Sequence, residues 1–316
     1  MNMPSNRSPE SVRNSQPPTP AAIAPAAVSG RQTMYWAIRR ELWENRAIYV
    51  APVAAAGIFL FGFLISTFHL ALQIRLASAL DPMQLTELIE KPYTLAAFLL
   101  MLTTLIVAIF YCLDALHGER RDRSILFWKS LPVSDLTTVL SKASIPLVVL
   151  PVITVAITIA TQWIMFLMST AALLASGLSP ATLWAHLPLS QMWVMVTFHL
   201  LALHGLSYAP AYCWLLLVSG WARRAAFVWA LLPPLAIGVV EKVAFNTSYI
   251  VSLLQSDFGS GPERAPFTIS DTMMIHPLTA ADVSSFLFSP GLWIGMFVVA
   301  AFLAAAVRLR RYQGPI

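Results

Sequence analysis

Residues 143–222 read ASIPLVVLPVITVAITIATQWIMFLMSTAALLASGLSPATLWAHLPLSQMWVMVTFHLLALHGLSYAPAYCWLLLVSGWA. These 80 consecutive residues contain no Asp, Glu, Lys or Arg. A membrane-spanning helix needs about 20 apolar residues, so the stretch is far too long for a single crossing. It is interrupted around Gly177, Pro180 and Pro188. The stretch therefore predicts two consecutive membrane spans.

The composition of the whole chain agrees with this interpretation. Of the 316 residues, 58% are hydrophobic and 11% are charged, whereas a soluble globular protein has about 25% charged residues. Cys112 and Cys213 both lie in apolar runs, where free cysteine behaves as a small hydrophobic residue. The sequence thus excludes a soluble enzyme, a nucleic-acid-binding protein and a disulfide-stabilised scaffold.

Uncharged intervals elsewhere in the chain predict four more spans. We expect an all-α membrane protein with six transmembrane helices, at about 48–71, 93–115, 144–175, 189–219, 225–246 and 285–307. Together they make a membrane domain over residues 47–312. Between spans five and six, residues 241–284 predict either an extension of span five or a re-entrant pair of short helices. Glu241 and Lys242 are interfacial if span five ends near Phe245.

The distribution of basic residues predicts the orientation in the membrane. With both termini inside, 16 of the 20 Lys and Arg residues lie on the cytoplasmic side and four on the other side. Cytoplasmic loops carry such an excess of basic residues. We therefore expect a multi-pass protein of the cytoplasmic (inner) membrane with both termini in the cytoplasm.

Two segments precede the first span. Residues 1–32 are rich in proline and polar residues, which predicts a disordered cytoplasmic tail. In residues 33–46, Met34, Ile38 and Leu42 are spaced four apart, and Arg40 and Glu44 form an i,i+4 pair. This pattern predicts an amphipathic helix at the membrane interface. A cytosolic helix that continues into the first span is the alternative.

The loop between spans two and three is the most informative part of the chain. Residues 117–142 read HGERRDRSILFWKSLPVSDLTTVLSK. A charge cluster at 119–123 is followed by an apolar set, Ile125, Leu126, Phe127, Trp128 and Leu131. Ser134 and Asp135 then form a helix-start signal. Exposed apolar groups on a charged loop usually cover a partner protein or a lipid surface.

At this loop the sequence resembles the membrane subunits of type-2 ATP-binding-cassette (ABC) exporters. Those permeases carry a Glu and a basic residue, an aliphatic-aromatic patch, a Leu-Pro pair and a Lys that opens span three. Here the corresponding residues are Glu119-Arg120, Ser124, Ile125-Leu126-Phe127, residues 130–134 (Ser-Leu-Pro-Val-Ser) and Lys142. The chain departs from the pattern at Asp122-Arg123, where many relatives have glycine. The resemblance covers about residues 33–310.

The resemblance implies a cytoplasmic coupling helix that docks on a separate ATPase subunit. Apolar anchors with a charged rim suit such docking. The implied coupling residues are Glu119, Arg120, Arg123, Leu126, Phe127, Trp128 and Leu131. The alternative is an amphipathic segment on the bilayer, where each basic residue contributes about 1 kcal/mol. The acidic residues of the loop favour docking.

The sequence also bears on cofactors and partners. None of the four lysines follows a glycine, so a GxxxxGK[ST] phosphate loop is absent. We expect no enzymatic activity and no cofactor or metal in this chain, with ATP and Mg²⁺ bound by the partner ATPase. The other expected partners are a second permease copy, as a homodimer or heterodimer, and membrane lipid, but no nucleic acid.

Polar residues within the spans form a candidate substrate path, namely Thr158, Thr161, Gln162, Trp163, His199 and His204. Core packing is the alternative for the span-three residues. On an α-helix with 3.6 residues per turn, His199 and His204 lie about 140° apart, which disfavours a shared metal site.

The predicted function is therefore that of an ABC exporter permease. Its rivals are a transporter driven by an ion gradient, for which a paired buried carboxylate is lacking, and a non-transporting immunity or sensor protein. An intramembrane enzyme lacks a catalytic constellation.

Overall fold

The computed structural model describes residues 30–77, 82–130, 133–246 and 280–312. Within these ranges the chain is helical and forms no strands. Six helices are long and apolar enough to cross a membrane: Ala47–His69, Leu88–Arg121, Asp135–Ala175, Leu183–Ser207, Ala226–Ala244 and Pro290–Tyr312. The prediction of an all-helical, multi-pass membrane protein is confirmed at this level.

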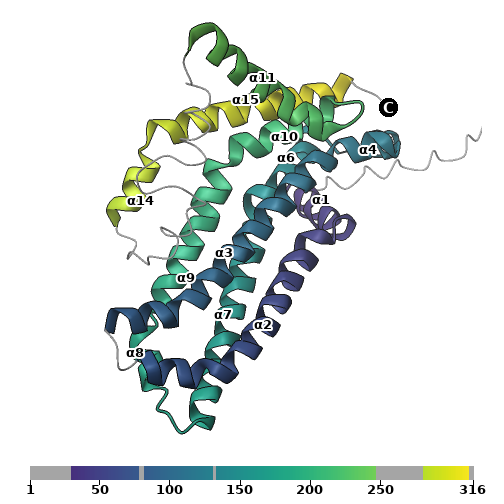
Figure 1. The fold of residues 1–316 in the computed structure, drawn as a ribbon. Coiled ribbons are helices and arrows are strands. Elements are labelled where there is room, and N and C mark those ends of the chain that lie inside the picture. The colour runs from purple at the N-terminus through teal and green to yellow at the C-terminus, as the bar shows by residue number, and fades with distance from the viewer. Residues whose placement is uncertain (1–29, 78–81, 131–132, 247–279, 313–316) are drawn as a thin grey trace, which may run out of the picture.

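Figure 1 shows the helices as an elongated bundle. The first half of the chain forms α1 (Gly30–Glu44), α2 (Ala47–Ala77), α3 (Pro82–Ala115), α4 (His117–Arg121), α5 (Ser124–Ser130), α6 (Asp135–Ser144), the π-helix η1 (Ile145–Val149) and α7 (Leu150–Ala175). The second half forms α8 (Ala181–His186), α9 (Leu189–Phe198), the π-helix η2 (His199–Ser207), α10 (Ala209–Trp221), α11 (Ala226–Phe245), α14 (Ala280–Leu287) and α15 (Pro290–Tyr312).

Helices α2, α3 and α7 pack against one another, and α10 packs against both α3 and α15. Hydrogen bonds between side chains reinforce the contact of α3 with α7. The hydroxyl oxygens of Thr104 and Thr154 are 2.6 Å apart, and those of Tyr93 and Ser169 are 3.3 Å apart. Such bonds stabilise helix pairs in lipid, where apolar burial gives little driving force.

The two π-helical segments, η1 and η2, lie against each other. Pro146 lies within η1, and Pro210 follows η2 in the first turn of α10. π-Helical turns are rare and widen the helix locally. At their contact, a Cβ atom on Gly205 would lie 2.8 Å from the carbonyl oxygen of Leu147. Only glycine permits this approach of the two backbones.

Few side chains of the span in helix α11 are buried in the bundle. Its side chains Val228, Leu232, Leu235 and Val243 are exposed, which suits hydrocarbon surroundings rather than water. The indole nitrogen of Trp214 donates a hydrogen bond to the carbonyl oxygen of Ala230 over 3.1 Å and so ties α10 to α11.

Helix α11 ends at Phe245, so Glu241 and Lys242 lie in its last turns. The two alternatives for residues 241–284 fall mainly on positions outside the described residues, as does most of the proline-rich tail.

Candidate functional site

The loop between α3 and α6 folds into two short helices, α4 and α5. They join at Asp122 and Arg123, and Arg123 has a φ of +58°. This left-handed conformation favours glycine, and here Arg123 adopts it. Helix α6 begins as predicted, because the Ser134 side chain accepts a hydrogen bond from the backbone N–H of Thr137 over 3.1 Å.

Glu119 is buried at the centre of an ion network. Its carboxylate is 3.0 Å from the guanidinium of Arg40, 3.1 Å from the ammonium of Lys142, and paired with the guanidinium of Arg310. The side chain is 7% exposed. Glu119 is therefore not part of the charged rim that the resemblance implies, since three cations from distant segments enclose it.

A second buried carboxylate extends the network to the N-terminal helix. Glu41, 1% exposed, lies 2.9 Å from the ammonium of Lys142 and 2.9 Å from the guanidinium of Arg40. It also accepts a hydrogen bond from the Tyr111 hydroxyl over 2.9 Å. The predicted pairing of Arg40 with Glu44 is confirmed at 3.2 Å. Helix α1 is thus held by its charged side as well as by its apolar side.

Arg310 completes the network from the last helix. Besides Glu119, its guanidinium contacts the carboxylate of Asp135 at 3.2 Å. We call the buried network the set Arg40, Glu41, Glu119, Asp135, Lys142 and Arg310. Three acidic and three basic side chains balance in formal charge, and they connect α1, α4, α6 and α15.

Arg120 anchors α4 in a different direction. Its guanidinium donates hydrogen bonds to the carbonyl oxygens of Gly220 at 2.6 Å and Ala222 at 3.4 Å. The Ser219 hydroxyl oxygen accepts hydrogen bonds from the backbone N–H groups of Leu116 and His117, at 3.0 and 2.9 Å. The start of α4 is therefore fixed to the end of α10, and Arg120 is buried rather than part of a rim.

Helix α5 presents an exposed apolar face. Leu126 is 58% exposed and Phe127 is 60% exposed, with the exposed Arg123 beside them. Ile125 is 2% exposed, so the expectation that it belongs to the exposed set is wrong: it packs inward and holds α5 in place. The side chain of Trp128 and all of Leu131 lie outside the described residues.

The candidate substrate path does not form one surface. Thr158, Thr161 and Gln162 are buried, and both threonine hydroxyls donate to carbonyl oxygens of their own helix. Trp163 is 44% exposed, and its ring lies 5.4 Å from that of Trp193, measured between centroids. Trp163 therefore faces away from Gln162.

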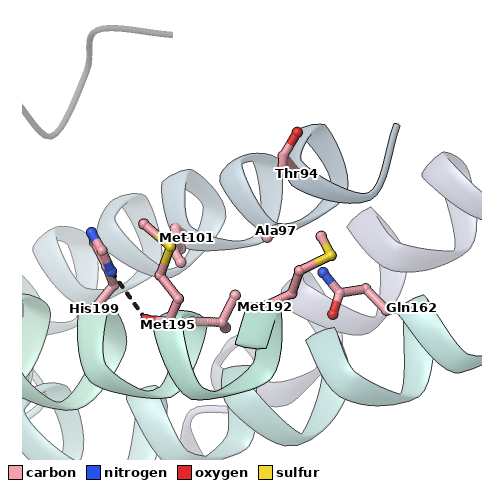
Figure 2. A pocket seen from close by; sticks show the side chains of 8 residues that line it. Thr94, Ala97, Met101, Gln162, Met192, Met195 and His199 are labelled. Atoms are coloured by element: carbon pink, nitrogen blue, oxygen red, sulfur yellow. Dashed lines mark hydrogen bonds between the residues drawn. The ribbon is translucent and has the colours of Figure 1, made fainter. Parts of the chain in front are cut away.

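Gln162 and His199 do line a common cavity between α3, α7 and α9 (Figure 2). The cavity is otherwise lined by Thr94, Ala97, Met101, Met192, Met195 and Val196. His204 is not among these residues and packs edge-on against the ring of Tyr208.

The angle of about 140° expected between His199 and His204 on an α-helix does not apply in the structure. His199 begins a π-helical segment that runs to Ser207 and contains His204, and with i→i+5 hydrogen bonds residues five apart lie about one turn apart, not 140°. Among the described residues, no group of three or more His, Cys, Asp and Glu side chains is placed to hold a metal ion.

Several network members are not singled out as site residues by the sequence. These are Glu41, Asp135 and Arg310, and with Tyr111, which donates a hydrogen bond to Glu41, they come from four different elements. The available signal is the position of Lys142 and Arg310 at the ends of long apolar helices, where a charge next to hydrocarbon needs a partner.

Comparison of the chain with protein-family models, with characterised proteins and with solved structures finds no match.

Proposed function

We propose that the chain is the membrane permease subunit of an ABC exporter in the cytoplasmic membrane. It forms the substrate path and takes its energy from a separate ATPase subunit. One observation carries the proposal: α5 presents Leu126 and Phe127 to the outside while α4, directly before it, is fixed by buried ion pairs to distant helices.

This arrangement suits the transmission of force. A docking helix must present apolar anchors, and its displacement must reach the spans. Glu119 on α4 is paired with residues on α1, α6 and α15, so a movement of α4 acts on all three helices. Breaking a buried ion pair by removal of one partner costs about 3–5 kcal/mol, which favours movement of the helices together.

The resemblance of the loop to type-2 exporters supports the same function. Glu119 and Lys142, which belong to the resembled pattern, are 3.1 Å apart. Without a phosphate loop in this chain, ATP and Mg²⁺ would be held by the ATPase, and we propose two permease copies with two ATPase subunits. The coupling residues proposed for the contact are Arg123, Leu126, Phe127, Trp128 and Leu131, with Glu119 and Arg120 behind them.

A bilayer-bound α5 is the main competing interpretation, since Leu126 and Phe127 could enter lipid and Arg123 could contact anionic headgroups. It is compatible with a transporter that uses no ATPase, or with a non-transporting immunity or sensor protein. The burial of Glu119 and Arg120 favours docking, because only Arg121, Asp122 and Arg123 of the charge cluster remain exposed, and one of these is acidic.

The test is a pair of truncations on α5. Phe127→Ala and Leu126→Ala should each weaken co-purification of the partner ATPase about 30-fold, because hot-spot anchors lose about 2 kcal/mol. Leu174→Ala is the matched control: Leu174 is 60% exposed on α7, far along the chain from α5. The purified chain alone should not hydrolyse ATP.

Two results would contradict the proposal. One is hydrolysis by the pure chain. The other is normal ATPase binding by the α5 variants together with reduced binding to vesicles that contain anionic lipid, which would make α5 a lipid-binding helix.

A further inference from the structure

The cavity between α3, α7 and α9 lies well away from the buried network. Gln162 follows Lys142 by 20 residues along the continuous run of α6, η1 and α7, which is about 30 Å at about 1.5 Å per residue. The volume of the cavity is about 30 Å³, enough for one or two water molecules or the polar head of a larger molecule. Figure 2 shows Gln162 near one end and His199 near the other.

Among the polar atoms that line the cavity, an acceptor on Gln162 has no partner, while the donors on Thr94 and Gln162 make hydrogen bonds. The Thr94 hydroxyl already donates a hydrogen bond to the carbonyl oxygen of Lys91 at 2.9 Å. The amide nitrogen of Gln162 donates to the carbonyl oxygen of Tyr93 at 3.3 Å. The amide oxygen of Gln162 is buried, and no atom of the described residues donates a hydrogen bond to it. A buried acceptor without a donor is costly and calls for an explanation.

His199 adds a second acceptor. Its Nδ1 atom is 3.0 Å from the carbonyl oxygen of Met195. Because a carbonyl oxygen can only accept, Nδ1 carries the proton, and Nε2 of the neutral ring is an acceptor. Among the polar side chains that line the cavity, the acceptors Gln162 Oε1 and His199 Nε2 face only one donor not yet assigned, the second N–H of the Gln162 amide.

This chemistry selects the ligand. The lining residues include no Lys or Arg to compensate an anion and no carboxylate to compensate a cation. Met101, Met192 and Met195 provide adaptable apolar contacts. What fits is an uncharged, apolar molecule with a hydroxyl group.

We propose that this cavity binds the hydroxyl head of a lipid-like alcohol, with the amide oxygen of Gln162 accepting its hydrogen bond. In this proposal the three methionines contact the first carbons of the alkyl chain of the alcohol. As a binding site it stands independently of the ATPase, whereas its identification as the site of the exported substrate rests on the function proposed above.

The experiment compares two photoreactive probes on the full chain, purified without an ATPase in phosphatidylcholine nanodiscs. One probe is hexadecan-1-ol with a diazirine close to the hydroxyl, and the other is its methyl ether. The alcohol should label peptides of α3, α7 and α9 about tenfold more than the ether, because the ether cannot donate to Gln162.

Gln162→Leu should remove this preference and leave the labelling by the ether unchanged, which also reports that the variant is folded. Gln191→Leu is the matched control, since Gln191 is exposed on α9 next to Met192. It should keep the preference.

Equal labelling of the parent by the alcohol and the ether would overturn the proposal and assign the cavity to water. A preference that survives Gln162→Leu would overturn it as well. Because these measurements use the chain without its ATPase, a failure of the coupling experiment on Phe127 does not affect them.

Discussion

At the scale of single residues, Lys142 is one of two cations, with Arg40, that bridge the buried carboxylates of the network. Its ammonium lies between two buried carboxylates, 2.9 Å from Glu41 and 3.1 Å from Glu119. The side chain itself is 3% exposed. Without Lys142, only the more exposed Arg40 would bridge the two carboxylates, and their mutual repulsion in a poorly solvated space would rise.

We therefore expect Lys142→Met to destabilise the protein by about 3–5 kcal/mol, which corresponds to a fall of about 10 °C in apparent Tm. Thermal unfolding of the purified parent and variant proteins measures this fall in apparent Tm. Lys242→Met is the control, because Lys242 is exposed on α11. Adding Glu41→Gln to Lys142→Met should recover part of the loss, since it removes one of the stranded charges. An unchanged Tm for Lys142→Met would show that the network does not hold the fold.

At this scale the sequence predicts local pairs better than distant ones. The Arg40–Glu44 pair follows from a spacing of four on a helix, and the start of α6 follows from Ser134. The pairing of Glu119 with Arg310 joins residues 191 positions apart. Nothing in local spacing indicates such a partner, so a loop glutamate is expected to be exposed when it is in fact enclosed.

At the scale of elements, the contact between η1 and η2 is the most constrained. Gly205 has a backbone carbonyl oxygen, that of Leu147, at the place where a Cβ atom would stand. Backbone cannot rotate away as a side chain does, so any larger residue must separate the two segments.

Gly205→Ala should accordingly destabilise the protein by about 1–3 kcal/mol through overpacking. Gly57→Ala on α2 is the matched control, because a Cβ atom there meets nothing within 4 Å. It should be neutral or slightly stabilising, since alanine favours a helix over glycine. Apparent Tm values of the two variants check this, and equal effects would show that the η1–η2 contact can relax.

The sequence predicts the membrane spans but not the π-helical segments. Long uncharged runs predict the spans because hydrocarbon thickness sets helix length. The π-helical turns are invisible to this reasoning, since a count of apolar residues does not depend on whether a turn holds 3.6 residues or more. For that reason the angle between His199 and His204 could not be predicted correctly.

At the scale of the whole molecule, the buried network and the cavity lie in different parts of one helical bundle. Figure 1 shows α4 and α8 toward opposite ends of the bundle. The network includes Glu119 of α4, whereas the cavity is lined by Thr94, Gln162 and Met192. The distribution of Lys and Arg predicts that the α4 end faces the cytoplasm.

Cysteine labelling in intact cells tests this orientation. Cys112 and Cys213 are buried, so a membrane-impermeant maleimide should report on introduced cysteines. Ser179→Cys, between α7 and α8, should react in intact cells, whereas Arg123→Cys and Ser5→Cys should react only after lysis. The reverse pattern would invert the topology and remove α5 from the reach of a cytoplasmic ATPase.

The position of Arg310 also has a consequence for synthesis. The ribosome delivers Glu119 to the membrane 191 residues before its partner Arg310. Until α15 is inserted, Glu119 and Asp135 lack this cation, and α4 lacks its tie to the last helix. Insertion of α15 thus completes the network, because before it three carboxylates share two cations, Arg40 and Lys142.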